Sequence, residues 1–595
     1  MGSGNIADTF ARHWRRWVVV LWAAIAIYCL QYRWQMIQAF ALQDTDDNMR
    51  MMQVRALLAG QRWFDLRQYR LDPPFGANIH WSRLVDLPMA GIIIALRSLV
   101  GGPLAEKIAV SLAPMLPMAV AMGAIALIAR RLIAPNAYLL AIAFLLCAHS
   151  TFYMWMPLRI DHHGWQLAFL SLVAAGIADR RPVRGGLFIG LASALSLAIG
   201  LEMLPLLAGA GAIVGLRWIH DRAETGRLIA YGITLSGGTA FSYLLFASYA
   251  NQAPVCDALS PVWLSTMTMA GALCVLLAAV GPEQRHWRLA LGIAAGAILA
   301  GAFAWAWPHC LGRLEGVSPE AQRLWLSHVR EARPVYRQAG DVIVSFVALP
   351  VIAIPGYAFL LWHHRRDRAR LIPWASLAVL SIGASAILLW QTRVGPAAEL
   401  LAVPGATGSA WLLLGAILRS RHALVRVLGT VGGFLLISGI AVQFATSYMV
   451  KGDTSERTKR INRANRLCPS LAALHPIALL PRGYVLTMVD LSPRLITVTH
   501  HDAVTGPYHR NYAAIVDVIE TFLGTADHAH HMIERRGIDY VLICPNFSES
   551  TNYEVQSPSG FYVQLLNDKA PPWLQPIPLP AHSPLKMWKV IRSGS

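Results

Sequence analysis

Charged residues are scarce in this chain of 595 residues, because Asp, Glu, Lys and Arg together make up only 14% of it. A soluble protein of this length carries about a quarter charged residues. The deficit is concentrated in the first 450 residues, and the mean hydropathy of the whole chain is +0.45. These values exclude a soluble globular protein for that stretch, which we expect to be embedded in lipid.

Three further absences narrow the choice of fold. Seven cysteines are too few for a disulfide scaffold. No small-residue cleavage site follows the apolar run 17–32, so we expect this run to be a retained signal anchor. The chain has no internal repeat, which weighs against a transporter built from inverted repeats.

Apolar runs of membrane length follow one another through the first 450 residues. We expect thirteen membrane spans, some of which extend into flanking residues to reach the roughly 20 residues that a bilayer needs. The run 85–100 carries Arg97 and ends at a Gly-Gly-Pro sequence, so we expect a helix at the membrane interface there; a fourteenth span is the alternative. The thirteen runs are 17–32, 107–129, 136–150, 164–178, 186–201, 203–217, 228–248, 262–281, 289–307, 341–362, 371–390, 398–418 and 424–446.

The distribution of arginine tests this count. With a cytoplasmic N-terminus, thirteen spans place arginine-rich loops inside and arginine-poor loops outside, as the positive-inside rule requires. The inner loops contain Arg130, Arg131, Arg180, Arg181, Arg184, Arg217, Arg222, Arg227, Arg285, Arg288, Arg365, Arg366, Arg368, Arg370, Arg419, Arg421 and Arg426. Topology therefore accounts for the net charge of +18, and no nucleic-acid partner is expected.

This topology predicts a polytopic α-helical membrane domain, residues 1–449, and a small soluble α/β domain, residues 450–595, on the outer side. The loops 33–106 and 308–340 are also outside. In the tail, 484–489, 495–498 and 540–543 are expected strands, and 513–523 and 528–536 are expected helices. Disulfides Cys256–Cys310 and Cys468–Cys544 are compatible with an oxidising compartment.

The first outer loop contains three carboxylates within four residues: Asp44, Asp46 and Asp47. They repel one another unless a cation or a base neutralises them. A solvated helix cap is the plain alternative, because Asp is common at that position. Three acids directly after a span favour a metal-binding or catalytic role.

The second outer loop contains Asp161, His162 and His163. Asp161 and His163 are two residues apart and can face one ion if the segment is extended. Oxygen and imidazole ligands suit a borderline divalent ion such as Mn²⁺. The alternative is an interfacial pair with ordinary hydrogen bonds, but polar groups at a membrane entry are costly and usually serve a function.

An acidic motif in the first outer loop, Asp161-His162-His163 in the second, thirteen spans and an outer C-terminal domain together resemble the GT-C glycosyltransferases. The chain is most similar to catalytic subunits of oligosaccharyltransferases, and its Asp-His-His motif is like that of archaeal members. The resemblance implies a divalent metal (Mn²⁺ or Mg²⁺) on Asp47, Asp161 and His163. It implies a catalytic role for Asp46 or Asp47, while Asp44 also fits by its spacing to Arg50. The Trp-Trp-Asp-Tyr-Gly motif, which reads the protein acceptor in that family, is absent from the tail.

Outer arginines are candidates for binding the donor phosphate, because a guanidinium donates planar paired hydrogen bonds to phosphate. They are Arg50, Arg83, Arg159 and Arg393, and anchoring of lipid headgroups is the alternative role for each. Candidate substrate contacts are His80, Trp81, His162, Glu331 and His501, each of which also has an ordinary structural reading.

We therefore expect a multi-pass enzyme of a bacterial inner membrane with its active site and C-terminal domain in the periplasm. It would transfer a sugar or glycan from a polyprenyl-phosphate or -pyrophosphate donor to a lipid, polysaccharide or protein acceptor. The resemblance implies that the reaction inverts the configuration of the sugar. An oligosaccharyltransferase acting on protein is the nearest alternative. A transporter or flippase is the rival from another class, but its acids would lie near the middle of spans. A non-catalytic scaffold is the third.

Overall fold

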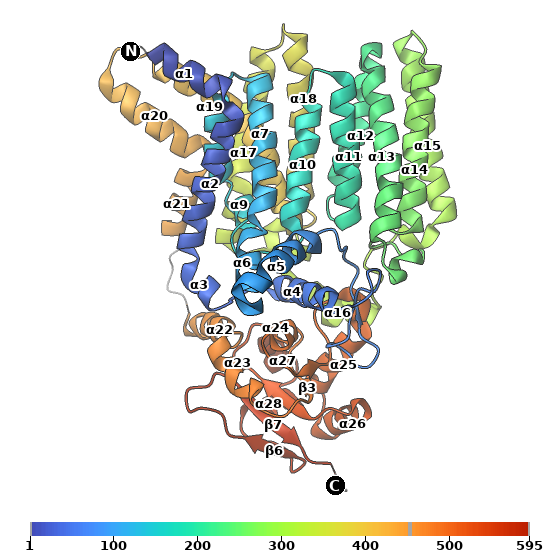
Figure 1. Cartoon of the computed structure of the whole chain (residues 1–595), viewed down its shortest axis with the longest axis vertical. Coiled ribbons are helices and arrows are strands. Elements are labelled where there is room, and N and C mark those ends of the chain that lie inside the picture. The colour runs from blue at the N-terminus through green and yellow to red at the C-terminus, as the bar shows by residue number, and fades with distance from the viewer. Residues whose placement is uncertain (1–2, 450–454, 593–595) are drawn as a thin grey trace.

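A bundle of apolar helices forms one end of the molecule and a small α/β domain forms the other in this computed structural model (Figure 1). The structure describes residues 3–449 and 455–592. Within these ranges, every one of the thirteen expected apolar runs lies on helix. The bundle helices are α2 (Trp14–Tyr32), α7 (Met115–Leu132), α8 (Ala137–Cys147), α10 (His163–Ile177), α11 (Pro182–Ile199), α12 (Leu204–His220), α13 (Thr225–Phe246), α14 (Pro261–Val280), α15 (Arg285–Ala306), α17 (Gly340–His363), α18 (Arg368–Ile387), α19 (Gly395–Ile417) and α20 (Ala423–Ile437), which α21 (Ile440–Met449) follows.

Length and composition qualify only some of these helices as spans. In the described part of the chain, eight helices are long and apolar enough to cross a membrane, or nine if the bent pair α20 and α21 counts as one. Three more, α8, α10 and α12, are apolar but shorter. Thirteen spans therefore stay a prediction. The N-terminal helix α1 (Ser3–Arg12) and the C-terminal domain lie at opposite ends of the bundle, as an odd number of crossings requires (Figure 1).

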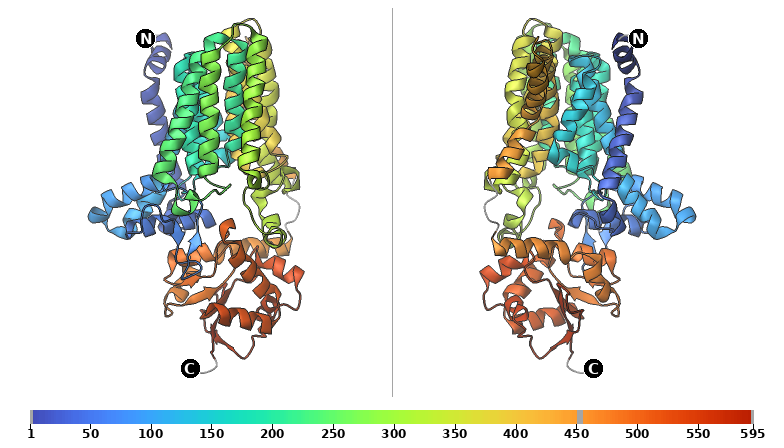
Figure 2. Two further views of the ribbon diagram at one scale, coloured as in Figure 1. Left: turned by 90° about the vertical axis from the view of Figure 1, so that its right-hand side faces the viewer. Right: turned by 90° about the vertical axis from the view of Figure 1, so that its left-hand side faces the viewer.

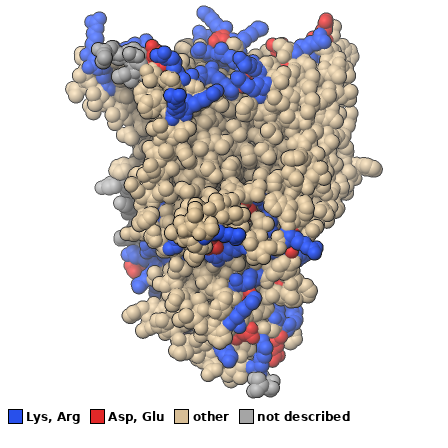
Figure 3. All heavy atoms as spheres, viewed as in Figure 1, with Lys and Arg blue, Asp and Glu red and all other residues tan. Residues whose placement is uncertain are grey.

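Charge is distributed as the topology predicts. Lysine and arginine gather at the end of the bundle that is farthest from the C-terminal domain, and the side of the bundle is a broad uncharged band (Figure 3). Apolar side chains are exposed along this band, for example Leu244, Ile293 and Leu428. An uncharged belt with a basic rim at one end is the pattern expected of a protein embedded in a bilayer.

The run 85–100 forms a helix that is not part of the bundle. Helix α5 (Asp86–Val100) ends at Gly101, whose φ of +82° favours glycine, and α6 (Gly102–Leu112) begins at once. The two helices pack as a hairpin that projects sideways at the end of the bundle near the C-terminal domain (Figure 2). This placement agrees with an interfacial helix and not with a fourteenth span.

The C-terminal domain is built on a mixed sheet. Its strand order is β4-β3-β5-β7-β6, in which β4, β3 and β5 are parallel and β7 and β6 are antiparallel to their neighbours. The expected boundary at residue 450 falls outside the described residues. The elements are α22 (Glu456–Leu467), α23 (Leu471–Ala478), β3 (Tyr484–Leu486), α24 (Ser492–Val498), β4 (Asp502–Ala503), α25 (Tyr512–Leu523), α26 (Ala526–Arg536), β5 (Tyr540–Ile543), α27 (Ser550–Gln556), α28 (Phe561–Leu566), β6 (Leu574–Ile577) and β7 (Lys586–Val590).

The sequence-based elements of this domain are mostly confirmed. Strand β5 and helices α25 and α26 lie where the patterns predict them, and β3 covers the first half of 484–489. The strand expected at 495–498 is wrong, because these residues form the end of helix α24. Pro493 in the first turn favours a helix start, and Thr497 donates a hydrogen bond to the backbone oxygen of Asn48 (3.2 Å).

The first outer loop is held tightly by the C-terminal domain. Apolar side chains of this loop, among them Met49 and Trp81, belong to the same buried core as the sheet. Ion pairs Arg70–Asp502 (2.6 Å) and Asp72–Arg536 (2.7 Å) join the two parts. The loop contains α3 (Trp34–Gln38), α4 (Thr45–Leu58), β1 (Arg67–Gln68) and β2 (Ala77–Asn78) in addition to α5 and α6.

Both disulfides that the sequence allows are formed. Cys256 pairs with Cys310, and Cys468 pairs with Cys544. The first bond ties the loop after α13 to the end of α15, and the second ties α22 to the end of β5. Cys29, Cys147 and Cys274 are free thiols. The bonded cysteines thus all lie at the end of the molecule that the topology places outside.

Candidate active site at the bundle and C-terminal domain junction

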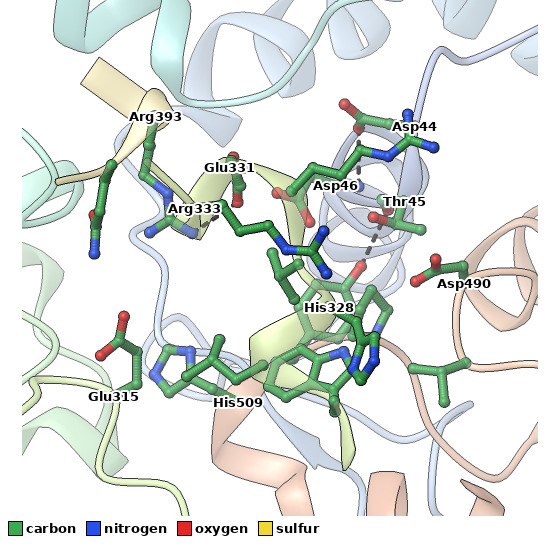
Figure 4. A pocket seen from close by; sticks show the side chains of 18 of the residues that line it. Asp44, Thr45, Asp46, Glu315, His328, Glu331, Arg333, Arg393, Asp490 and His509 are labelled. Carbon is green, nitrogen blue, oxygen red and sulfur yellow. Dashed lines mark hydrogen bonds and ion pairs between the residues drawn. The ribbon is translucent and has the colours of Figure 1, made fainter. Parts of the chain in front are cut away.

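A cavity of about 1280 Å³ lies between the bundle and the C-terminal domain. Its wall combines the start of α4, the loop between α11 and α12, the segment 312–333, the turn before α19 and loops of the C-terminal domain. Figure 4 shows acidic and basic side chains side by side around it, such as Glu331 beside Arg393 and Arg333. Asp46, Glu331 and Arg393, three of the expected site residues, line this cavity.

The three acids of the first loop have different surroundings because they begin a helix. Asp44 caps α4, and its carboxylate accepts hydrogen bonds from the backbone N–H groups of Asp46 (3.0 Å) and Asp47 (3.1 Å). The Asp47 carboxylate accepts the Asp44 N–H in return (3.2 Å) and is fully buried. Asp46 faces the cavity. Burial first, and then the charges of Asp161 and Asp44, raise its pKa well above the usual range.

The two acidic loops meet, as the sequence predicts, and Arg159 joins them. Its guanidinium pairs with Asp44, with Asp47 (3.0 Å) and with Asp161 (3.1 Å). The backbone N–H of Asp161 donates to the second oxygen of Asp47 (3.0 Å). Burial raises the pKa of Asp47 well above its usual range, although Arg159 opposes the shift. Arg159 is therefore an internal counter-ion of the cluster, and its role as a phosphate ligand stays a prediction.

Two histidines extend the cluster at the start of α10. His163 Nε2 lies 3.6 Å from Asp161 Oδ2, and His162 Nδ1 lies 2.7 Å from Asp161 Oδ1. Burial opposes ionisation of Asp161, but His163, His162 and Arg159 outweigh it and hold the pKa of that carboxyl well below its usual range. Burial would also lower the pKa of His162, but the carboxylates of Asp161 and Glu202 raise it to about 10.

The donor set of this cluster fits a divalent cation. Ligand atoms of Asp161, His162 and His163 lie within 4.8 Å of one another. Asp161 Oδ1 and His162 Nδ1 are buried, and they lie 2.7 Å from each other. Asp47 is not part of this group, because both its oxygens accept hydrogen bonds from Arg159 and the backbone. A metal contact to Asp47 would require Arg159 to move.

Two other clusters of possible ligands fit a metal less well. Cys256 and Cys310, beside His309, are joined in a disulfide and cannot bind one. In the cluster of His80, Asp257 and His509, the carboxylate accepts hydrogen bonds from Arg510 on both oxygens (2.7 Å each). Arg510 already neutralises the Asp257 carboxylate, so we interpret the cluster as a contact between the outer loops and the C-terminal domain.

Two arginines, Arg393 and Arg333, also line the cavity. Arg393, in the turn before α19, pairs with Glu331 (2.7 Å) and remains 30% exposed. The charge of Glu331 is the main reason that the pKa of Arg393 is raised above its usual value. Arg333 also projects into the cavity (Figure 4). Arg393 is thus the one expected phosphate ligand, of the four named, that lines this space.

Three further expectations are corrected by burial. Arg50 and Arg83 are fully buried and pair with Asp86 (2.8 and 3.2 Å), so they cannot reach a phosphate in the cavity. His501 is also fully buried, and its Nδ1 accepts the backbone N–H of Gly483 (3.2 Å). It is a core residue of the C-terminal domain.

The remaining expected contacts lie at the cavity. His80, Trp81 and His162 line it. The Trp81 ring contacts the rings of His162 and Tyr508, each with a centroid distance of 5.5 Å, and the Arg50 guanidinium lies over the Trp81 ring, 4.5 Å from its centroid. Trp81 therefore supports His162 and also closes the wall.

The sequence analysis missed Glu202 and Gln166. Glu202 lies 3.2 Å from His162 Nε2 and accepts a hydrogen bond from Gln166 Nε2 (2.6 Å), and Gln166 Oε1 lies 3.2 Å from His163 Nδ1. A signal was present for Glu202, because it is a lone acid between the apolar runs 186–201 and 203–217 on the outer side. Gln166 carried no such signal.

This architecture, a helical bundle with acidic outer loops beneath a C-terminal domain, is similar to that of solved oligosaccharyltransferase structures. The archaeal oligosaccharyltransferase AglB from Archaeoglobus fulgidus, in complex with an inhibitory peptide and a dolichol-phosphate, superposes with a TM-score of 0.66 and 13% identity. That match covers 93% of this chain and 72% of AglB. The apo form of an Archaeoglobus fulgidus oligosaccharyltransferase gives a TM-score of 0.64 and 16% identity, over 92% of this chain and 72% of that chain. Its complex with Zn and sulfate gives 0.60 and 12%, over 91% and 69%.

The likeness is one of fold and not of sequence. The chain matches no protein-family model and no curated protein sequence. At identities of 12 to 16%, side-chain roles in the solved structures cannot be transferred by position.

Proposed function

We propose that this protein is a membrane glycosyltransferase that takes a sugar or glycan from a polyprenyl-phosphate or -pyrophosphate donor. The observation that carries this proposal is the Asp161-His162-His163 cluster at the wall of a cavity between the helices and the C-terminal domain. The fold likeness supports it, because the solved AglB complex contains a dolichol-phosphate and an Archaeoglobus fulgidus oligosaccharyltransferase structure contains Zn and sulfate. We place the reaction on the periplasmic side of a bacterial inner membrane.

Asp161 and His163 would hold the divalent cation, Mn²⁺ or Mg²⁺, with His162 beside them. When bound, such an ion offsets negative charge that develops on phosphate oxygens of the leaving group. Glu331 lines the same cavity; its charge contributes to the raised pKa of Asp46, and His163 contributes to the lowered pKa of Glu331. It is the acid best placed to approach the same ion from the segment 312–333.

Asp46 is the carboxylate that we assign as general base. It faces the cavity, whereas Asp44 caps α4 and Asp47 is buried against Arg159. A carboxylate within hydrogen-bond reach of an acceptor hydroxyl or amide can take its proton as the new glycosidic bond forms. Arg393 and Arg333 are placed to donate hydrogen bonds to the donor phosphate from the membrane side.

The acceptor would enter from the C-terminal domain, which forms the opposite wall. The residues that follow β3 read Thr487-Met488-Val489-Asp490, with no aromatic pair. Because the aromatic acceptor-reading motif is absent, transfer to protein asparagine is not the form of the reaction that we favour. We favour a hydroxyl-bearing lipid or polysaccharide acceptor.

A transporter is less well supported by the position of the acids. Asp46 lies in the first turn of α4, and Asp161 and Glu202 lie in loops next to helix ends. One acid is buried within a bundle helix: Glu399 of α19, which accepts hydrogen bonds from Ser150 (2.7 Å) and the Thr151 N–H (3.1 Å). These contacts tie α19 to the short helix α9 (His149–Tyr153) and give Glu399 a structural role.

The proposal predicts two separable ligand effects on the purified protein in detergent. Mn²⁺ should raise the unfolding temperature of the wild type but not of Asp161→Ala, and undecaprenyl phosphate should stabilise the wild type but not Arg393→Ala. Turnover of a lipid-linked glycan should fall at least about 10²-fold in Asp46→Asn. Glu315→Gln, which removes another cavity acid, serves as the control and should retain both shifts. A wild type that neither ligand stabilises would contradict the proposal.

A further inference from the structure

Glu202 contacts both histidines of the cluster through two separate routes. Its Oε1 lies 3.2 Å from His162 Nε2, and its Oε2 accepts a hydrogen bond from Gln166 Nε2 at 2.6 Å. Gln166 then reaches His163, because its Oε1 lies 3.2 Å from His163 Nδ1. Gln166 is fully buried and Glu202 lies at the cavity wall.

We propose that Glu202 is a positioning residue that, through Gln166, fixes the tautomer of His163 in which Nε2 is free to bind a metal. The argument rests on the proposed metal site and concerns residues that no part of the family resemblance assigned.

The first step of the argument is the orientation of the Gln166 amide. An ionised carboxylate only accepts hydrogen bonds, so Glu202 requires the NH₂ end of Gln166 to face it. The carbonyl oxygen of Gln166 must then face His163. A carbonyl oxygen only accepts, and His163 must therefore carry its proton on Nδ1.

The second step concerns the other nitrogen of His163. In neutral imidazole one nitrogen donates and the other carries a lone pair, so a protonated Nδ1 leaves the lone pair on Nε2. That lone pair faces Asp161 Oδ2 at 3.6 Å. Two electron-rich atoms that face each other favour a cation between them. Hydrogen bonds of this kind orient metal-bound histidines in many sites.

The chain makes room for this arrangement at the break between α11 and α12. Helix α11 ends at Ile199, and a Cβ added to Gly200 would collide with the Glu202 carboxylate oxygen. Pro205 lies in the first turn of α12 and fixes where that helix begins. The Glu202 side chain is thereby directed back toward α10 and away from the bundle core.

The plain alternative is that Glu202 merely ties α12 to the first turn of α10. A structural tie would affect stability but not the chemistry of His163. The experiment must therefore measure the metal site itself, on full-length protein that has kept its fold.

The test compares Mn²⁺ binding by wild type, Glu202→Gln and Glu315→Gln. Electron paramagnetic resonance measures the concentration of free Mn²⁺ and the coupling of bound Mn²⁺ to imidazole nitrogen. Glutamine can donate as well as accept, so Glu202→Gln no longer dictates the Gln166 orientation. We expect about 10- to 100-fold weaker Mn²⁺ affinity and a reduced coupling to imidazole nitrogen. Glu315→Gln should bind as the wild type does, and Glu202→Asp should recover part of the affinity.

The outcomes separate this inference from the proposed function. If the wild type and Glu202→Gln bind Mn²⁺ equally and show the same nitrogen coupling, the positioning role is wrong while the metal site stands. If the wild type binds no Mn²⁺, the metal site and the positioning role both fail. If Glu202→Gln only lowers the unfolding temperature of the metal-free protein and leaves affinity unchanged, Glu202 is a structural tie.

Discussion

Arg50, Arg83 and Asp86 form a fully buried charge cluster beneath the cavity wall. Breaking a buried pair on one side leaves a charge without compensation and costs about 3–5 kcal/mol. We expect Asp86→Asn to destabilise the protein by about that amount, because both buried arginines lose the carboxylate that they share. Thermal unfolding in mild detergent measures the effect.

The matched control for this variant is Glu106→Gln, which removes the partner of Arg55 from a half-exposed pair (2.7 Å). Such pairs contribute about 1 kcal/mol or less. Arg55 also keeps its hydrogen bond to the backbone oxygen of Thr497. If both variants lowered the stability of the protein equally, burial would not explain how much the Asp86 ion pairs contribute to that stability.

Which site residues the sequence revealed depended on whether their partners were local. Asp44, Asp47 and Asp161 formed visible clusters, and the structure brings the two clusters together. Arg159 and Arg50 are alike in the sequence, and only the packing shows that both are counter-ions of buried acids. Glu202 gains its role from α12 lying beside α10, which no local pattern encodes.

At the scale of elements, the turn after β3 is tied to α27 by one carboxylate. Glu549 accepts the backbone N–H groups of Val489 (2.9 Å) and Asp490 (2.8 Å) and the hydroxyl of Tyr553. Burial, and then the charge of Asp490, raise the pKa of Glu549 to about 8. Burial raises the pKa of Asp490 to about 6, although Arg330 opposes it.

These shifts give the contact a definite pH dependence. A carboxyl whose pKa is raised on folding binds its proton more tightly in the folded state, so it stabilises most below about pH 4. That stability is lost as the pH rises through about 6 and then about 8. We expect a lower unfolding temperature at pH 8.5 than at pH 5.5, and a smaller difference in Glu549→Gln.

Glu554→Gln, on the same helix, is the control and should retain the wild-type pH response. A Glu549→Gln protein that loses stability between pH 5.5 and 8.5 as steeply as the wild type would contradict this assignment. Comparison of variants is needed because other groups also titrate across this range.

Helix α24 shows where element prediction from sequence failed. The run Leu495-Ile496-Thr497-Val498 is apolar and β-branched, which favours a strand. Its contacts with the first outer loop are instead made as a helix. Thr497 donates to the backbone oxygen of Asn48 in α4, and Arg494 donates to the backbone oxygen of Phe40 (2.9 Å), which precedes α4. A longer helix with a clear amphipathic pattern, such as α25, was correctly predicted, because its own sequence pattern is sufficient to identify it as a helix.

At the scale of the whole molecule, the decisive question is which ends lie on which side of the membrane. The basic rim lies opposite the C-terminal domain (Figure 3), and α1 lies at that basic end (Figure 1). The positive-inside rule then predicts a cytoplasmic N-terminus and a periplasmic C-terminal domain. The disulfides at the C-terminal end agree with an oxidising compartment there.

Two exposed histidines allow this orientation to be measured with matched substitutions. His422 lies just before α20 at the basic end, and His528 lies on α26 of the C-terminal domain. In a background in which Cys29, Cys147 and Cys274 are replaced by serine, we expect a membrane-impermeant maleimide to label His528→Cys in intact spheroplasts. His422→Cys should be labelled only after the membrane is opened. Labelling of both from the same side would require an even number of crossings between them and would overturn the thirteen-span topology, and with it the periplasmic placement of the cavity.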